Sequence, residues 1–142
     1  MSVLEKTAWI FSACLTISYL TYIIVVFVRA GDAPLAETAY VGPLVTSFVA
    51  SVVLTVVGAV IASMANPREA DRTDERDEVI SRHGDAIALW VLSLGVLGPL
   101  VLAMIEVAHF WIANALYLNL VVASVVGTVA KLVAYRRGVA PW

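Results

Sequence analysis

The chain has 142 residues, of which 61% are hydrophobic and only 14% are charged, and its net charge at pH 7 is −2. Soluble domains average about 45–50% apolar and about 25% charged residues, so this composition indicates an integral membrane protein. The small negative charge argues against a nucleic-acid-binding protein, and the high apolar content against a disordered chain. Cys14 is the only cysteine, which excludes an intrachain disulfide.

Four uncharged stretches are long enough to cross a bilayer, which takes about 20 apolar residues in a helix. They run over residues 7–28, 38–67, 86–105 and 107–130. In lipid the backbone must be hydrogen-bonded within each segment, so all four are expected to be helical. The first is expected to be a retained helix, because it is longer than the apolar region of a typical signal peptide. We predict an all-α integral membrane four-helix bundle, a single domain with helices at about 7–28, 42–64, 86–106 and 112–134.

The lysines and arginines flank these helices unevenly. With four crossings, Arg29 lies alone on one side, and the other eight share the side of both termini: Lys6, Arg68, Arg72, Arg76, Arg82, Lys131, Arg136 and Arg137. Cytoplasmic segments of membrane proteins carry the excess of lysine and arginine. The chain is therefore expected to form two helical hairpins in the cell (inner) membrane, with both termini cytoplasmic.

The loop at 65–85 joins the two hairpins and holds most of the charge, since eleven of the eighteen residues from Arg68 to Asp85 are charged. A solvated helix entrance that fixes topology explains this pattern, and a docking surface for a cytosolic protein is the alternative. Val79, Ile80 and Ile87 begin an apolar face, so the third helix is expected to extend into the cytoplasm. The candidate partner-binding residues are Arg68, Arg72, Asp74, Glu75, Arg76, Asp77 and Arg82.

Two charged motifs carry a resemblance to a known family. One is Asp74-Glu75-Arg76-Asp77 followed by Ile80, Arg82 and Gly84, and the other is the ending Leu132-Val133-Ala134-Tyr135-Arg136-Arg137-Gly138. Residues 70–139 resemble a family of small multi-pass membrane proteins of bacteria and archaea, of unknown function. The first hairpin is similar to that family only in length and hydropathy. The resemblance implies four spans and implies no activity.

Glu106 and His109 form a Glu-x-x-His pair, which shares one helical face if the turn between the last two helices stays helical. Di-iron bundles use this spacing but need two such pairs and two further glutamates, so a symmetric dimer would have to supply the second pair. The alternative is a locally hydrogen-bonded pair at the outer interface. Glu106 and His109 are the candidate metal ligands, and no cofactor is predicted.

Small residues form stripes along two of the predicted helices, and such stripes let membrane helices pack closely. The candidate packing residues are Ser51, Thr55, Gly58 and Ala62 in the second helix and Ala123 and Gly127 in the fourth. These contacts lie within one chain or across a dimer, and the stripes alone do not decide between the two. The first helix adds Ser12, Ala13 and Thr16, which is more small surface than one bundle needs. We therefore expect an isologous homodimer through the second or the fourth helix.

Gly95 and Pro99 lie in the middle of the third helix. A proline at position 99 removes the hydrogen bond to the Gly95 carbonyl and is expected to kink the helix. A freed carbonyl at membrane depth needs a hydroxyl, a water or a ligand as its partner. Gly95 and Pro99 are therefore candidates for a buried ligand site, although kinks without a ligand are also common.

No charged residue lies at mid-bilayer, which argues against a coupled transporter or proton pump. The chain also has no nucleotide-binding loop and no nucleophile–base set. We expect a non-enzymatic, homodimeric membrane interaction or regulatory protein whose charged loop docks a cytosolic protein. The alternatives are a carrier for a lipid or small solute with a cavity at the Pro99 kink, and a metal or redox site at Glu106 and His109. The expected partners are membrane lipid, a second copy and a cytosolic protein, not nucleic acid.

Overall fold

The computed structural model describes residues 3–65 and 75–137, and these form helices with short connections and no strand. The helices are α1 (Val3–Ala30), the short η1 (Leu35–Glu37), α2 (Val41–Ala65), α4 (Glu75–Gly95), α5 (Leu97–Met104) and α6 (His109–Arg137). Within these described residues, four helical spans are long and apolar enough to cross a membrane, with α4 and α5 together forming the third. The predicted all-α fold with four apolar helices is confirmed.

Most observed ends extend the predicted helices, most of all at the start of the third span, whereas its end falls at Met104, short of the predicted residue 106. α4 begins at Glu75, well before residue 86, as the apolar face at Val79 and Ile80 indicates. Val79 is exposed and Ile80 is fully buried, so only part of that face packs against the protein. α6 begins at His109 rather than near 112.

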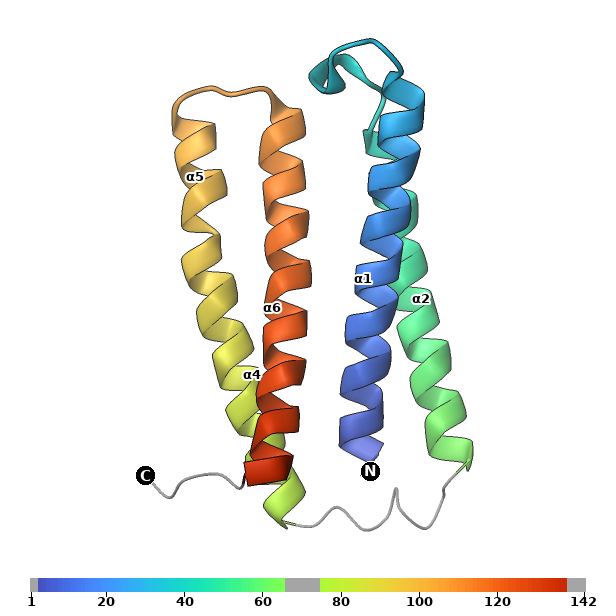
Figure 1. Cartoon of the computed structure of the whole chain (residues 1–142), viewed down its shortest axis with the longest axis vertical. Coiled ribbons are helices and arrows are strands. Elements are labelled where there is room, and N and C mark those ends of the chain that lie inside the picture. Colours follow the sequence, from blue (N-terminus) through green and yellow to red (C-terminus); the bar gives the residue numbers. More distant parts are fainter. Residues whose placement is uncertain (1–2, 66–74, 138–142) are drawn as a thin grey trace.

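The helices lie in an open row rather than in a closed bundle (Figure 1). α1 packs along α2 and α6, and α4 and α5 pack against α6, whereas α2 makes no extended contact with α4 or α5. Burial reflects this order, since 28% of the α1 span and 39% of the α6 span are buried, against 6% of each outer span. α1 and α6 are therefore the inner helices of the row.

The two ends of the row differ. α1 begins and α6 ends at the same end, which we call the termini end (Figure 1). The opposite end, the loop end, carries η1 and the turn between α5 and α6. α4 lies close to α6 near the termini end, and α5 diverges from α6 toward the loop end.

Glycines set the close approach of α4 to α6. A Cβ atom added at Gly84 would lie 2.9 Å from the Gly127 carbonyl oxygen, and one at Gly127 would lie 2.7 Å from the Ala88 Cβ. Lipid tails are as apolar as leucine side chains, so close van der Waals packing of small residues holds such helices together. Gly127 of the predicted stripe therefore packs within the chain, and Gly84 is its partner.

The other predicted packing residues also meet neighbours within the chain. A Cβ at Gly58 of α2 would lie 2.7 Å from Cγ2 of Ile10 in α1. Ser51 and Ala123 are buried, while Thr55 and Ala62 are half-buried. The homodimer stays a prediction, and it requires a surface other than the occupied parts of these stripes.

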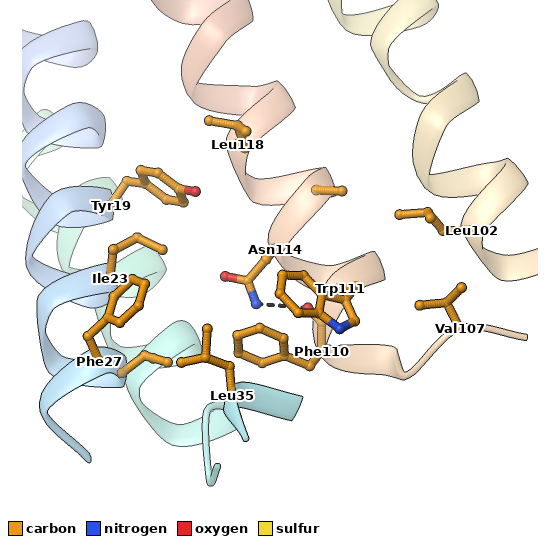
Figure 2. Close-up of a pocket in the computed structure, with 12 residues that line it drawn as sticks. Tyr19, Ile23, Phe27, Leu35, Leu102, Val107, Phe110, Trp111, Asn114 and Leu118 are labelled. Atoms are coloured by element: carbon orange, nitrogen blue, oxygen red, sulfur yellow. Dashed lines mark hydrogen bonds between the residues drawn. The ribbon is translucent and has the colours of Figure 1, made fainter. Parts of the chain in front are cut away.

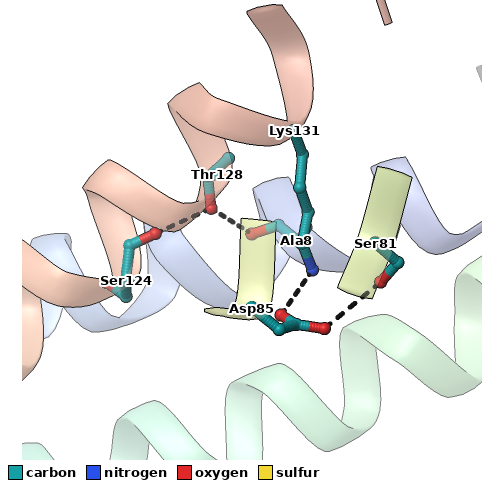
Figure 3. Close-up of polar contacts among 6 residues, drawn as sticks. All are labelled: Ala8, Ser81, Asp85, Ser124, Thr128 and Lys131. Carbon is teal, nitrogen blue, oxygen red and sulfur yellow. Dashed lines mark hydrogen bonds and ion pairs between the residues drawn. The ribbon is translucent and has the colours of Figure 1, made fainter. Parts of the chain in front are cut away.

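Polar contacts join the helices at the termini end (Figure 3). The Lys131 ammonium lies 2.8 Å from Oδ1 of Asp85, and the Ser81 hydroxyl donates to Oδ2 of the same carboxylate. The Thr128 hydroxyl lies within hydrogen-bond distance of the Ala8 carbonyl in α1, at 3.3 Å. These contacts connect α6 to α4 and to α1.

Candidate functional site

A groove of about 550 Å³ lies at the loop end, between α1, η1, α5 and α6. Figure 2 shows its walls, with Tyr19, Ile23 and Phe27 on α1 facing Leu102 and Val107 across the groove. Its lining surface is almost entirely hydrocarbon and contains no charged side chain. We call this hollow the apolar groove.

The apolar groove exists because α5 leaves α6. Val96 lies between α4 and α5, three residues before Pro99, and the expected kink at Pro99 stays a prediction. The backbone bonds from Val96 to Leu92 and from Leu100 to Val96 are kept, at 3.1 and 3.0 Å, so the break is local. α4 is held against α6 at the glycine contact, and α5 diverges from α6 toward the loop end (Figure 1).

Aromatic packing closes the groove at the loop end. The Phe110 ring meets Tyr40 and Trp111 edge-on, with ring centroids 5.1 Å apart in both pairs. Such edge-to-face pairs contribute about 0.5–1.5 kcal/mol beyond the burial of their area. The short helix η1 adds Leu35 to the same wall. The loop end is therefore packed rather than loose.

Besides the indole N–H of Trp111, the polar side-chain groups on the wall belong to Asn114 and Tyr19. The Asn114 amide nitrogen donates to the Phe110 carbonyl at 2.8 Å, while its Oδ1 is buried without a hydrogen-bond partner. The fully buried Tyr22 has an unpartnered hydroxyl that lies near the Asn114 side chain. A buried polar group without a hydrogen-bond partner costs about 1–3 kcal/mol, so a small side-chain rotation that lets the Tyr22 hydroxyl donate to Oδ1 of Asn114 is favourable. Both atoms lie behind the hydrocarbon surface, at the contact of α1 with α6.

The sequence predicts a ligand beside Gly95 at the kink, but in the structure a side chain of α6 occupies that space. Asn119 of α6 packs directly on Gly95, and its amide nitrogen donates to the Leu92 carbonyl at 2.9 Å. Pro99 is buried and lines neither large hollow. The cavity therefore lies beyond the kink toward the loop end, beside Leu102, because a carboxamide already occupies the site next to Gly95.

Asn114 and Asn119 are the polar residues that our sequence analysis missed. Both lie inside a long apolar stretch, where polar side chains are costly and usually find a partner on a neighbouring helix. Their presence in that stretch is visible from the sequence. Their partners are not, because Leu92 is 27 residues from Asn119 along the chain.

Glu106 and His109 do not share a helical face. α5 ends at Met104 and α6 begins at His109, and Glu106 lies in the turn with a positive φ of 56°. Both side chains are exposed. Among the described residues there is no group of three or more His, Cys, Asp or Glu side chains placed to hold a metal ion. The metal site stays a prediction, without the helical spacing on which it was based.

Only part of the candidate docking surface falls within the described residues. Arg68, Arg72 and Asp74 lie outside them, and Glu75 and Arg76 are described only as the start of α4. Arg82 forms an exposed ion pair with Glu78 at 2.6 Å, one helical turn away. Asp77 is half-buried. An exposed pair of this kind contributes little to stability, which fits a solvated helix entrance as well as a docking surface.

Comparison of the chain with protein-family models, with curated proteins and with solved structures gave no match. The resemblance of residues 70–139 to a family of small multi-pass membrane proteins therefore stays a prediction.

Proposed function

We propose that the protein is a non-enzymatic, lipid-binding membrane protein that holds an apolar lipid chain in the apolar groove. The observation that carries the proposal is a hydrocarbon-lined hollow of about 550 Å³ between helices long enough to span a bilayer. Ligand sites in proteins typically measure about 300–1,000 Å³. This is the lipid-carrier alternative of the sequence analysis, with the site moved from the Pro99 kink to the loop end.

The physical reason for a lipid chain is that the groove suits neither water nor a charged ligand. A buried water needs two to four polar partners, and an empty hollow loses the dispersion contacts of its lining atoms. In a bilayer, acyl or isoprenoid chains surround the protein, and one of them restores those contacts. The wall holds no charged group that would bind a phosphate or an ammonium within the groove.

The proposed topology has both termini in the cytoplasm and the loop end on the outer side of the cell membrane. Its support is the charge distribution, since Lys6, Arg82, Lys131 and Arg136 belong to the termini end and Arg29 to the loop end. The apolar groove would then open within the outer leaflet. The homodimer, the docking role of the loop at 65–85 and the metal site at Glu106 and His109 stay predictions beside this proposal.

Filling the groove tests the proposal. Ala115 lines the apolar groove, so Ala115→Trp is expected to place an indole in the volume meant for the lipid chain. Leu116→Trp is the matched control, because Leu116 is exposed, one residue away on α6, and lines neither hollow. The probe is a phosphatidylcholine with a photoactivatable diazirine in its acyl chain, added to the protein in nanodiscs.

We expect Ala115→Trp to reduce the photo-crosslinking yield about tenfold, since it removes a whole bound chain rather than one contact. Leu116→Trp is expected to leave the yield within about twofold of the wild type. Circular dichroism checks that both variants keep their helices. Equal yields for the wild type and both variants would show that the label samples the general lipid-facing surface, and the proposal would be lost.

A further inference from the structure

A second hollow lies between α1 and α2, on a face of α1 different from that of the apolar groove. It measures about 630 Å³ and combines apolar residues, among them Ile17 and Leu54, with hydroxyl-bearing ones, among them Thr46. Arg29 lies on its wall at the loop end, and no acidic residue does. We call this hollow the Arg29 groove. It is amphipathic, with a cation at one end and hydrocarbon along its length.

Arg29 has no ionic partner within residues 3–65 and 75–137. This is notable because the loop end carries three carboxylates, Asp32, Glu37 and Glu106, and no other lysine or arginine. An arginine in the last turn of a helix also interacts favourably with the helix dipole, and that effect explains its position on α1. It does not explain why the side chain lines a groove against α2 rather than pairing with an acid.

The first turn of α2 adds to the positive potential at this end of the groove. Gly42 and Pro43 of that turn lie on the groove wall with Arg29. The N-terminus of a helix carries a partial positive charge and free N–H groups, which favour anions. A guanidinium offers N–H donors in a planar fork that matches the oxygens of a phosphate. The two features together fit a phosphate group.

We infer that the Arg29 groove binds an anionic phospholipid, with its phosphate on Arg29 and one acyl chain between α1 and α2. The apolar length of the groove from Val25 to Leu54 provides the place for the chain. A zwitterionic lipid fits less well, because its ammonium finds no carboxylate on the wall. This site is separate from the apolar groove and does not depend on the proposed function.

Native mass spectrometry of the full chain, released from nanodiscs with equal amounts of phosphatidylglycerol and phosphatidylcholine, tests the inference. The wild type is expected to retain phosphatidylglycerol about three- to tenfold more often than phosphatidylcholine. Arg29→Gln removes the cation and is expected to abolish the preference, while Arg29→Lys keeps the charge without the fork and is expected to keep part of it. Arg82→Gln, at the termini end, is the charge-matched control and is expected to retain the preference.

A second pair of variants tests the place of the acyl chain. Ala50→Trp fills the Arg29 groove and is expected to lower retained phosphatidylglycerol about as much as Arg29→Gln does. Val49→Trp is the control, because Val49 is exposed and lies outside the groove. Adding inorganic phosphate distinguishes the source of the phosphate, and we expect it not to displace the lipid.

Several results would overturn the inference. Equal retention of the two lipids by the wild type would show that no anionic site exists. Loss of the preference in Arg29→Gln but not in Ala50→Trp would make Arg29 a headgroup anchor with no chain in the groove. Displacement by inorganic phosphate would make the site one for a free anion. An effect of Ala115→Trp on this preference would also contradict it, because that variant alters only the apolar groove.

Discussion

Replacing Gly84 with leucine is expected to lower the free energy of unfolding by about 3 kcal/mol, the upper end of the cost of overpacking. The first side-chain carbon would lie 2.9 Å from the Gly127 carbonyl oxygen and would also overlap the Lys131 side chain. The lysine chain can move, but the backbone of α6 cannot yield without separating the two helices. Unfolding in mixed micelles at increasing sodium dodecyl sulfate measures the loss.

Gly98→Leu is the control for this substitution. Gly98 belongs to the same span, in α5, and a Cβ atom there would meet nothing within 4 Å. Leucine is a better helix former than glycine by up to about 1 kcal/mol, so this variant is expected to be as stable as the wild type or slightly more stable. If Gly84→Leu were as stable as Gly98→Leu, the close contact of α4 with α6 would be wrong.

The second large effect is a coupling between Gly95 and Asn119. Gly95→Ala is expected to cost about 1–2 kcal/mol, because the new methyl group takes the space of the Asn119 carboxamide and breaks its bond to the Leu92 carbonyl. In an Asn119→Ala background the same change is expected to be neutral or stabilising, since it removes a glycine from a helix and meets no carboxamide. The same micelle titration of the four proteins gives the double-mutant cycle.

A coupling free energy near zero would show that the two residues act independently, and it would contradict the packing of Asn119 on Gly95. Additive costs in the cycle would give that result, because sites that share no contact contribute independently. Gly42→Ala is a useful reference here, since its methyl group would face open space.

The spans were predictable from the sequence because lipid imposes one rule on all of them. An apolar stretch of sufficient length must be helical, and the charged residues at its ends mark where it leaves the bilayer. The sequence also predicts a kink in the third span, because Pro99 lacks the N–H that would continue the hydrogen-bond ladder, and the structure separates α4 from α5 nearby, at Val96. The extension of the third helix before residue 86 was expected from Val79 and Ile80, but its exact start at Glu75 was not predictable, since a helix that continues into water needs no apolar residues.

The arrangement of the helices could not be predicted in the same way. Gly127 was identified as a packing residue, but its partner Gly84 lies 43 positions earlier, in a segment that the sequence indicated mainly as charged. A stripe of small residues shows that a helix packs closely and not with which helix. This is why the stripes suggested a dimer and the structure uses much of them within one chain.

No pattern in the sequence predicted either of the two hollows. Each is bounded by residues from two or more elements, and the apolar groove forms because α4 is held against α6 while α5 diverges from it. Its lining residues, such as Ile23 and Leu102, are indistinguishable in the sequence from residues that face lipid. The sequence shows that Arg29 is the single lysine or arginine on its side of the predicted topology, but only the structure places it against α2.

Mapping where a lipid chain is bound tests the central claim most directly. Wild-type protein in nanodiscs is photolabelled with the diazirine-bearing phosphatidylcholine, and the modified residues are located by mass spectrometry. Labels are expected to concentrate on the apolar groove, at Leu102, Val107 and Leu118, above the level on the exposed residues Val53 and Val57 of α2. Labels spread evenly over the groove and α2 would contradict the claim, because the groove would then be ordinary lipid-facing surface.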